Sequence, residues 1–314
     1  MRRQNGHGIY AQPCCPQLHC DFISGTISAM KLCRFLHPDG VARIGAVTDP
    51  ATLLDLTAAG LPDLTTLLEA DDPLAGLRNL IKANPPSVGL DGIQLLAPVE
   101  RQEVWAAGVT YLRSKSARME ESDFSASAYD RVYAAERPEL FFKSLAEKVV
   151  APGGQVGIRR DATWNVPEPE LALVLNSRGE IVGHTIGNDM SSRDIEGENL
   201  LYLPQAKTYH RSCALGPWIV LGTTEAQARE WDIRMAIHRA GENVFAGETS
   251  VGQIKRRFDE LAGYLFRSQC FPHGAVLLTG TGIIPPEQFT LHEGDRVRIE
   301  VTGIGGLQNT VTVV

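Results

Sequence analysis

Two apolar runs separated by a short turn sequence constrain the fold of this chain more than any other feature. The first run covers Leu171 to Leu175 and the second covers Ile181 to Ile186, with Asn176-Ser177-Arg178-Gly179 between them. Apolar segments of this length on either side of a turn that contains asparagine and glycine predict a β-hairpin. We therefore expect an antiparallel pair of strands in the middle of the chain.

Further segments extend this strand-rich pattern toward the C-terminus. Apolar residues alternate over 233–237 and again over 297–301, which predicts two more strands. Ser250-Val251-Gly252-Gln253 matches a capping box, so we expect a helix to begin there. Its apolar face would carry Ile254, Phe258, Leu261 and Leu265. Many antiparallel strands with a few helices indicate an α+β fold that is mainly β.

The first hundred residues divide into two expected parts. Residues 30–97 combine a hairpin signal around His37-Pro38-Asp39-Gly40 with a leucine- and alanine-rich helical stretch. We interpret them as a small N-terminal α+β domain, followed by a main domain over 98–314. In the main domain, residues 103–111 predict a strand that runs into a loop, and the serine-rich segment 112–135 predicts a helix or a mobile lid.

Residues 1–29 are expected to be a disordered leader. The chain has six cysteines, which are Cys14, Cys15, Cys20, Cys33, Cys213 and Cys270. The first three lie in this leader. Their spacing fits no zinc pattern, and prolines interrupt any apolar signal-peptide core. We therefore expect a protein with reduced thiols that acts in the cytoplasm.

Composition excludes two classes of function. Hydrophobic residues make up 43% of the chain and charged residues 21%, as in ordinary globular proteins. The formal net charge of −7 argues against binding to a nucleic acid, which needs a basic surface. No apolar run approaches the roughly 20 residues of a membrane helix. We expect neither a nucleic acid nor a membrane as a partner.

The segment Val166-Pro167-Glu168-Pro169-Glu170 gives the first indication of chemistry. Two carboxylates separated by one residue in extended backbone point to the same side of a strand. If Asn176 faces Gly179 in the hairpin turn, Glu168 lies opposite Gly187, and Asp189 points the same way at the same open end. This argument depends on the register, because a slip of one residue would turn Asp189 to the other face.

Three carboxylates on one face predict a site for a divalent cation. Hard oxygen ligands select Mg²⁺, with Mn²⁺ or Ca²⁺ as substitutes. The alternative is a solvated acidic strand end, which an isolated Glu-x-Glu would favour. The flanking prolines and the position of Asp189 favour a metal held by Glu168, Glu170 and Asp189.

Lys207 could orient an anionic substrate or transfer protons, and Gly280-Thr281 could present a backbone N–H and a hydroxyl to an anion. Taken alone, each of these is more typical of an ordinary surface lysine or of a plain turn.

Taken together, the segments of the C-terminal two thirds resemble the fumarylacetoacetate hydrolase superfamily. The matching pieces occur in family order over about residues 100–310. They are Gly108-Val109-Thr110-Tyr111, Arg137 to Lys143, Glu168 to Val174, Gly187 to Asp194, Lys207, Leu215 to Trp218, Thr279-Gly280-Thr281 and Leu291 to Asp295.

The resemblance implies a mixed β-roll catalytic domain, a homodimer or homotetramer, and Mg²⁺ bound by Glu168, Glu170 and Asp189. It implies 2-keto acid substrates that chelate the metal. The lysine and the glycine–threonine pair of the family fall on Lys207 and on Gly280 and Thr281.

One departure bears on the reaction. Hydrolytic members usually carry a histidine three residues after the motif tyrosine, whereas Ser114 follows Tyr111 at that distance here. The run from Glu196 to Lys207 and the segment around Glu139 resemble the dehydratase branch instead. The resemblance therefore implies Mg²⁺-dependent dehydration of a 2-keto-3-deoxypentonate, such as the arabinonate, to 2,5-dioxopentanoate.

In that reaction we expect Lys207 and Glu139 to transfer protons. The residues expected to contact the substrate are Tyr111, Lys143, Gln205, Gly280 and Thr281. Three alternatives stay open: an acylpyruvate- or fumarylacetoacetate-type C–C bond hydrolase, a 2-keto acid decarboxylase, and a 2-keto-acid-binding protein without turnover.

Overall fold

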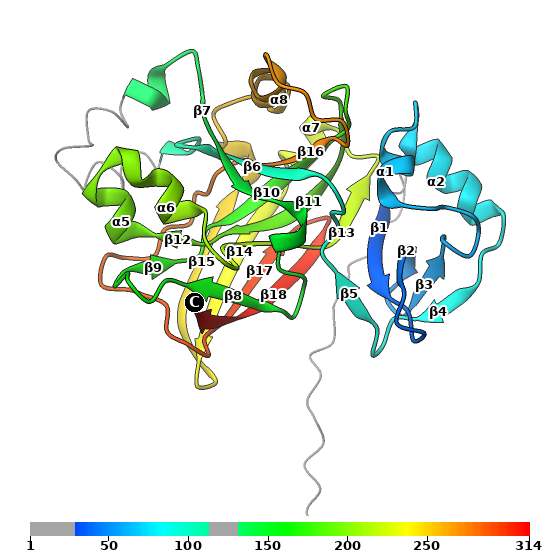
Figure 1. Cartoon of the computed structure of the whole chain (residues 1–314), viewed down its shortest axis with the longest axis horizontal. Helices are drawn as coiled ribbons and strands as arrows, with labels where there is room; N and C mark the ends of the chain where they lie inside the picture. Colours follow the sequence, from blue (N-terminus) through cyan, green and yellow to red (C-terminus); the bar gives the residue numbers. More distant parts are fainter. Residues whose placement is uncertain (1–28, 113–130) are drawn as a thin grey trace, which may run out of the picture.

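The computed structural model describes residues 29–112 and 131–314. Within these residues the chain is mainly β, as expected, and two large sheets pack face to face in the body of the molecule (Figure 1). The larger sheet has eleven strands and the smaller has five in this part of the chain, and a short two-stranded sheet accompanies them. The predictions for 1–29 and for most of 112–135 lie outside the described residues.

The central strands of the larger sheet carry the candidate site. Their order is β13, β11, β10, β16, β6 and β7, and neighbours pair antiparallel except for the parallel pair β16 and β6. The bounds are β6 Glu103–Gly108, β7 Glu139–Ser144, β10 Pro169–Leu175, β11 Ile181–Asp189, β13 Cys213–Leu221 and β16 Ala275–Leu278. Every residue of β10, β13 and β16 is buried, so both faces of this part of the sheet are covered.

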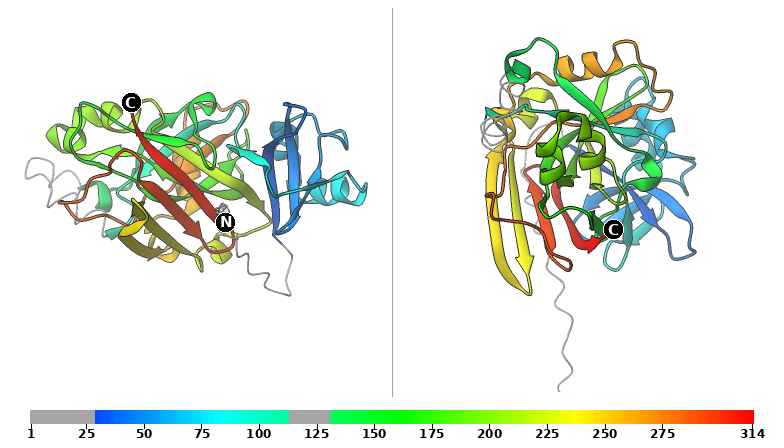
Figure 2. Two further views of the ribbon diagram at one scale, coloured as in Figure 1. Left: turned by 90° about the horizontal axis from the view of Figure 1, so that it is seen from below. Right: turned by 60° about the vertical axis from the view of Figure 1, so that its left-hand side comes forward.

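The N-terminal region forms the other end of the same sheet. It contains β1 Met30–Leu36, β2 Ala42–Asp49, β3 Thr52–Asp55, α1 Leu64–Leu68, α2 Pro73–Lys82, β4 Ser87–Gly89 and β5 Gln94–Leu96. The expected hairpin is present as β1 and β2. Strand β1 also pairs with β13, with Lys31 opposite Val220, so the sheet continues from this region into the body (Figures 1 and 2). The division into domains at residue 97 stays a prediction.

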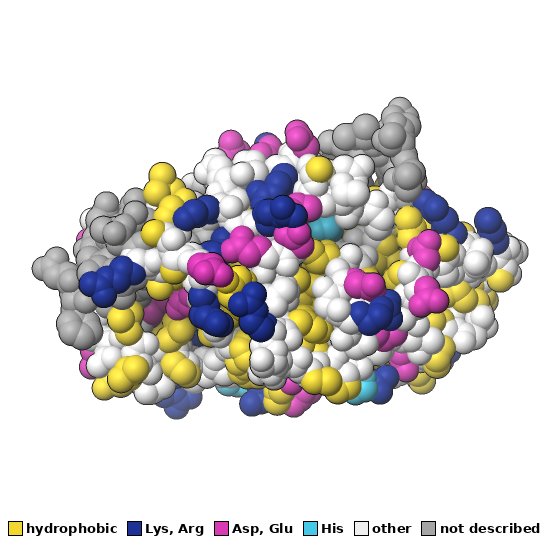
Figure 3. Space-filling model, turned by 90° about the horizontal axis from the view of Figure 1, so that it is seen from above, with side chains coloured by type: hydrophobic (Ala, Val, Ile, Leu, Met, Phe, Trp, Pro, Cys, Tyr) yellow, Lys and Arg dark blue, Asp and Glu magenta, His cyan; other side chains and the backbone are white. Residues whose placement is uncertain are grey.

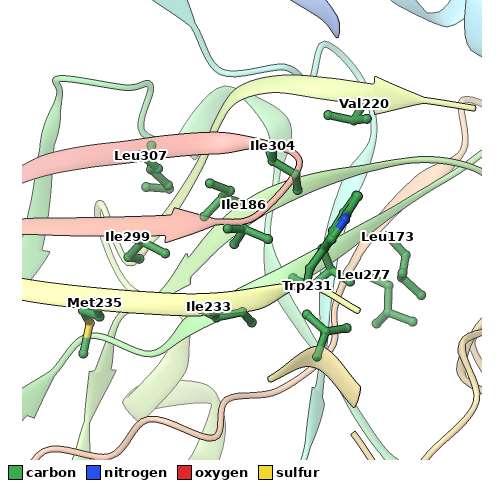
Figure 4. Close-up of a cluster of buried hydrophobic side chains, with 14 of the residues drawn as sticks. Leu173, Ile186, Val220, Trp231, Ile233, Met235, Leu277, Ile299, Ile304 and Leu307 are labelled. Carbon is green, nitrogen blue, oxygen red and sulfur yellow. The ribbon is translucent and has the colours of Figure 1, made fainter. Parts of the chain in front are cut away.

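The five-stranded sheet closes the roll. Its order is β15 Glu242–Ser250, β14 Asp232–Arg239, β17 Arg296–Val301, β18 Gly305–Val313 and β8 Gln155–Ile158. Alternate residues of β14 and β17 are buried, which confirms the predicted periodicity. Figure 4 shows Ile233 and Ile299 of this sheet near Ile186 of the larger one, and Met235 and Leu173 belong to the same buried cluster. This packed apolar layer fixes the position of β10 and β11.

A short strand and three short helices follow the end of β11. They are β12 Ser191–Ser192, α5 Arg193–Glu198, η2 Leu200–Tyr202 and α6 Leu203–Lys207. Strand β12 pairs with β9 Asn165–Val166. The remaining elements are η1 Ala146–Lys148, α7 Glu225–Ala228, η3 Val251–Gln253 and α8 Phe258–Phe266. None of the helices within the described ranges has the length and apolar character needed to cross a membrane.

The helix predicted to begin at Ser250 begins later. The Ser250 hydroxyl does accept a hydrogen bond from the Gly252 amide at 3.1 Å, but it caps only the turn η3. The Ile254 carbonyl then accepts from the Arg229 guanidinium at 2.9 Å, so a side chain replaces the helical hydrogen bond. Helix α8 starts at Phe258, and Phe258, Leu261 and Leu265 form its buried face as predicted.

The register of the central hairpin differs from the expected one by two residues. Glu170 lies opposite Gly187 rather than Thr185. One residue of the difference comes from the turn, where Asn176 pairs with Glu180 instead of Gly179, and the other from the shift of the ladder between Val174 and Leu175. A shift of two residues preserves which face each side chain occupies. The expectation that Glu168, Glu170 and Asp189 share one face is therefore correct although the pairing was wrong.

Candidate active site

The open end of the central hairpin brings two carboxylates into direct register. The Glu168 amide donates to the Asp189 carbonyl at 3.2 Å, and the Asp189 amide donates to the Glu168 carbonyl at 2.9 Å. Pro169, between the two glutamates, has no N–H and keeps φ in the extended range. Glu168, Glu170 and Asp189 consequently project from the same side of β10 and β11.

These three side chains form a buried carboxylate cluster. Each offers an oxygen, and these atoms all lie within 4.8 Å of one another. Their exposed fractions are 6%, 1% and 1%. Burial and the neighbouring charges of Asp189 and Glu168 raise the pKa of Glu170 well above its ordinary value. A bound cation would relieve this repulsion, so the donor set fits a divalent metal ion with hard oxygen ligands.

Lys207 bridges two members of the cluster from α6. Its Nζ lies 2.7 Å from Glu168 Oε2 and 3.3 Å from Asp189 Oδ2, and it donates to the Ser191 hydroxyl at 2.7 Å. The chain turns through β12 and α5 after Asp189, which returns Lys207 to the carboxylates eighteen residues later. The ammonium is 98% buried at the cavity wall, where it faces both the cluster and any bound anion.

A second lysine supports the cluster from behind. Lys143 on β7 forms an ion pair with Asp189 and donates to the Met190 carbonyl at 3.0 Å and to the Lys207 carbonyl. Its side chain is fully buried and is absent from the residues that line the cavity. Lys143 thus fixes both Asp189 and the backbone of Lys207.

Arg193 links the cluster to a fourth carboxylate. Its Nη1 lies 3.2 Å from Glu168 Oε1 and 3.8 Å from Glu196 Oε2. The guanidinium also packs over the Trp164 ring, with 5.8 Å between its central carbon and the ring centroid. Because Arg193 and Glu196 are three residues apart on α5, the helix sets their separation.

A glycine turn after β16 completes the inner wall. The Gly280 amide donates to Glu170 Oε2 at 2.5 Å. Gly280 has a φ of +88°, and a Cβ there would lie 2.2 Å from Thr110 Oγ1. The position therefore requires glycine, both for its backbone conformation and for the close approach of Thr110. Thr281 follows it in the cavity wall.

Two adjoining cavities lie over these residues. The inner one has a volume of about 30 Å³, room for about one water or ion. Its lining comprises Ala107, Gly108, Val109, Glu139, Phe141, Glu168, Glu170, Asp189, Glu196, Lys207, Gly280 and Thr281. The outer cavity has about 360 Å³ and is lined by Val132, Arg137, Pro138, Glu139, Glu196, Leu200 and Leu203. Of the described residues, Glu139 and Glu196 line both.

Comparison with known proteins identifies the family. A model of the fumarylacetoacetate (FAA) hydrolase C-terminal domain matches residues 103–312, about two thirds of the chain. The chain belongs to the fumarylacetoacetate hydrolase family. The resemblance inferred from the sequence motifs is thereby confirmed.

Two relatives within this family are similar over most of their length. A probable 2-keto-3-deoxyxylonate dehydratase of Haloferax volcanii is 50% identical over 217 residues, which cover 69% of this chain and 74% of the relative. A 2-dehydro-3-deoxy-D-arabinonate dehydratase of Saccharolobus solfataricus is 38% identical over 224 residues, which cover 70% and 75%.

A solved structure extends the likeness to the fold. The structure of 2-keto-3-deoxy-D-arabinonate dehydratase complexed with magnesium and 2,5-dioxopentanoate superposes with a TM-score of 0.75 and 32% identity. The match covers 90% of this chain and 99% of the other. The expected architecture of the fumarylacetoacetate hydrolase family is therefore present in this chain.

The structure brings most of the predicted site residues together. Glu139, Lys207, Gly280 and Thr281 line the inner cavity with the carboxylate cluster. Tyr111 is fully buried, where burial and the charge of Glu170 raise the pKa of its hydroxyl. Their roles in binding and catalysis stay predictions.

Two predicted substrate contacts lie elsewhere. Lys143 sits behind the carboxylates, because Asp189 and two backbone carbonyls take up its ammonium group. Gln205 is exposed, and its backbone carbonyl accepts a hydrogen bond from the Arg159 guanidinium at 3.2 Å. Neither side chain is among those that line the two cavities.

Sequence reasoning did not single out Glu196 or Arg193 as site residues. Both are charged and at least 95% buried, which is unusual for these residue types. The signal in the sequence was their spacing of three residues just after Asp189, which places two side chains side by side if the segment is helical. That spacing alone does not show that the helix faces the cavity.

Proposed function

We propose that this protein catalyses the Mg²⁺-dependent dehydration of a 2-keto-3-deoxypentonate to 2,5-dioxopentanoate. The observation that carries the proposal is a buried cluster of three carboxylates, bridged by Lys207, in the wall of the inner cavity. The dehydratase names of two relatives, at 50% and 38% identity, indicate the same reaction class. The enzyme would thus be a carbon–oxygen lyase.

Glu168, Glu170 and Asp189 are the residues proposed to hold the metal. When bound there, Mg²⁺ would supply Lewis acidity to the carboxylate and 2-keto oxygens of the substrate, which makes a C3 proton easier to remove. Mn²⁺ or Ca²⁺ could replace it on the same oxygen ligands. The remaining steps belong to side chains of the protein.

Lys207 and Glu139 are the proposed proton-transfer groups. Both line the inner cavity, and the Lys207 ammonium is held at its wall by Glu168 and Ser191. The first step removes a proton from C3 and breaks the C4–O bond, with a second proton delivered to the departing hydroxyl so that water leaves. One group acts as the base and the other as the acid.

The Gly280–Thr281 turn beside Glu170 is proposed to orient the substrate. Thr281 is 95% buried, and its hydroxyl accepts a hydrogen bond from the Ile283 amide at 3.2 Å. This contact fixes the oxygen of Thr281 at the cavity edge. The Gly280 turn brings the inner wall close to Glu170. Together they would limit how a 2-keto acid can enter.

Three alternatives remain on the same scaffold, and one of them, a 2-keto acid decarboxylase, would share the metal site. A C–C bond hydrolase would use the same metal site, but the position usually held by the activating histidine carries Ser114. That residue lies outside the described part of the chain. A 2-keto-acid-binding protein without turnover would not need Lys207 at the carboxylates.

The deciding experiment supplies the purified protein with Mg²⁺ and each C4 epimer of 2-keto-3-deoxypentonate. We expect one epimer to lose water and to yield 2,5-dioxopentanoate, followed by mass spectrometry and aldehyde trapping. EDTA and a Glu170→Ala variant should each abolish the reaction. A Glu147→Gln variant, altered at an exposed position on η1, should retain it.

The competing outcomes are distinct. Release of pyruvate from an acylpyruvate, with no turnover of either epimer, would place the protein among the hydrolases. Binding of a keto acid without any product would indicate a non-catalytic protein. Either result would overturn the dehydratase proposal.

We also propose that the protein acts in the cytoplasm as a homodimer or homotetramer. Cys33 and Cys213 are buried free thiols, which is compatible with a reducing compartment. Acidic and basic side chains are interspersed on the face seen in Figure 3, with no broad basic area there for a nucleic acid. Light scattering coupled to size-exclusion chromatography would measure the assembly.

A further inference from the structure

The product of the proposed reaction places a demand on C5 of the substrate that elimination alone does not meet. Loss of the C3 proton and the C4 hydroxyl leaves an enone with a double bond between C3 and C4 and an intact alcohol at C5. In 2,5-dioxopentanoate, C5 is an aldehyde. A proton must therefore leave C5, so a second base is needed at the far end of the substrate.

The cavities indicate where that end would lie. The inner cavity of about 30 Å³ has room for about one ion, so a substrate that reaches a metal on Glu168, Glu170 and Asp189 can place little more than its chelating oxygens there. The remaining carbons of the substrate must extend into the adjoining outer cavity of about 360 Å³. Of the described residues, Glu139 and Glu196 alone line both cavities, so C5 would pass between these two carboxylates.

The two carboxylates reach this passage from different elements. Glu139 belongs to β7 and lies against Gly108 of the inner wall, where a Cβ on Gly108 would come within 2.1 Å of Glu139 Oε2. Glu196 belongs to α5, at the start of the α5–η2–α6 segment whose Leu200 and Leu203 line the outer cavity. With Glu139 assigned to the elimination at C3 and C4, Glu196 is the carboxylate that remains for chemistry at C5.

Glu196 is a carboxylate that is shielded from water and held in place by an arginine. The side chain is 95% buried, which excludes most of the water that would weaken a carboxylate base. Arg193 Nη1, at 3.8 Å, holds one of its oxygens, while the same guanidinium lies 3.2 Å from Glu168. Arg193 therefore fixes the distance between the metal-binding end and Glu196.

We infer that Glu196 is the base that removes the C5 proton after dehydration, an inference that rests on the proposed function. The C5–H electron pair forms a C4=C5 bond as the C3=C4 pair shifts to form C2=C3. The resulting dienolate takes a proton at C3 from the group that first removed one. The C4=C5 enol then gains a proton at C4 and loses its hydroxyl proton, which gives the aldehyde. The enone and the product are isomers, so no oxidant is required.

The test separates the two halves of the reaction. A Glu196→Gln variant of the Mg²⁺-loaded enzyme receives 2-keto-3-deoxypentonate, and NMR follows vinyl and aldehyde protons while water loss is measured by mass. We expect water loss near the wild-type rate, accumulation of the enone, and aldehyde formation slowed about 100-fold, the scale of a lost general base. Substrate deuterated at C5 should slow aldehyde formation but leave water loss unchanged.

The control is Glu198→Gln, a matched change at an exposed position two residues along the same helix. It should leave both steps unchanged. Equal slowing of water loss and aldehyde formation in Glu196→Gln would overturn the inference, and so would aldehyde formation at the wild-type rate. Failure of the wild-type enzyme to release water from the substrate would instead refute the proposed function.

A second readout excludes a purely structural effect. Mg²⁺ affinity and pyruvate affinity, measured by calorimetry, report on the inner cavity alone. Both should match the wild type in Glu196→Gln. A loss of either would show that Glu196 supports the metal site through Arg193 and would count against its role at C5.

Discussion

At the scale of single residues, repulsion between like charges destabilises the carboxylate cluster when no cation is bound. Glu170 shows this most clearly, because burial beside Asp189 and Glu168 raises its pKa. Lys207, Lys143 and Arg193 balance part of the charge. Within the described residues their ion pairs with the cluster are to Glu168 and Asp189, so Glu170 is the member most dependent on the metal.

Glu170→Gln should therefore separate metal affinity from stability. Glutamine resembles the protonated acid and can still accept the Gly280 N–H, so the metal-free protein should unfold at the same temperature or higher. Mg²⁺ affinity should fall more than the roughly 10- to 100-fold seen when residues that only support a ligand are lost. Calorimetry and thermal unfolding in EDTA measure the two effects. A lower unfolding temperature without metal would contradict this account.

Lys143→Met should lower stability far more than a surface change. It would leave the Asp189 carboxylate buried without its ammonium partner, which typically costs about 3 to 5 kcal/mol. Urea unfolding of the metal-free protein measures this free energy. The control is Lys148→Met, at an exposed position five residues later. Similar unfolding midpoints for the two variants would show that Lys143 does not support the cluster.

At the scale of elements, strand β11 contributes one buried titratable group outside the site. His184 is 1% exposed and packs edge-on against Trp231, with 5.7 Å between ring centroids. Neither ring nitrogen has a hydrogen-bond partner within the described residues. Burial therefore lowers the pKa of His184 from 6.5 to about 4.

This lowered pKa predicts a specific loss of stability in acid. Between pH 6.5 and about pH 4 the unfolded chain binds a proton that the folded histidine does not. The contribution of His184 is complete above pH 6.5 and declines as the pH falls toward 4. At about 1.4 kcal/mol per pKa unit, it amounts to roughly 3 kcal/mol.

The difference in unfolding free energy between the wild type and His184→Leu, measured from pH 7 to pH 4, isolates this effect from other groups. The wild type should lose stability relative to the variant over that range. His292→Leu, at an exposed position, should leave the pH dependence unchanged. Parallel curves for the wild type and His184→Leu would show that folding does not lower the pKa of this histidine.

The elements also show what the sequence could and could not predict. Local patterns located the hairpin and its shared carboxylate face, because alternation fixes sidedness even when the register is off by two residues. The start of α8 was missed because Arg229, distant in sequence, takes the Ile254 carbonyl. The antiparallel pairing of β16 with β10, whose register brings Gly280 to Glu170, has no local signal at all.

At the scale of the whole molecule, the N-terminal region shares a sheet with the catalytic strands. Removing residues 30–97 would deprive β13 of its partner β1 and would uncover apolar residues that pack with Leu32 and Ile44. An exposed edge strand of this kind promotes association. We expect a chain of residues 98–314 to be largely insoluble, as measured by its soluble fraction and by size-exclusion chromatography. A soluble, monodisperse and folded product would establish residue 97 as a true domain boundary.

The order in which the site assembles follows from the hairpin register. Glu168 and Asp189 exchange backbone hydrogen bonds within one hairpin, so these two ligands can meet soon after the ribosome has synthesised them. Lys207 comes eighteen residues later, and the Gly280 amide that contacts Glu170 emerges only near the end of synthesis. A nascent chain therefore carries its carboxylates before it has the groups that balance them, and an early metal ion could act as a folding partner before it serves in catalysis.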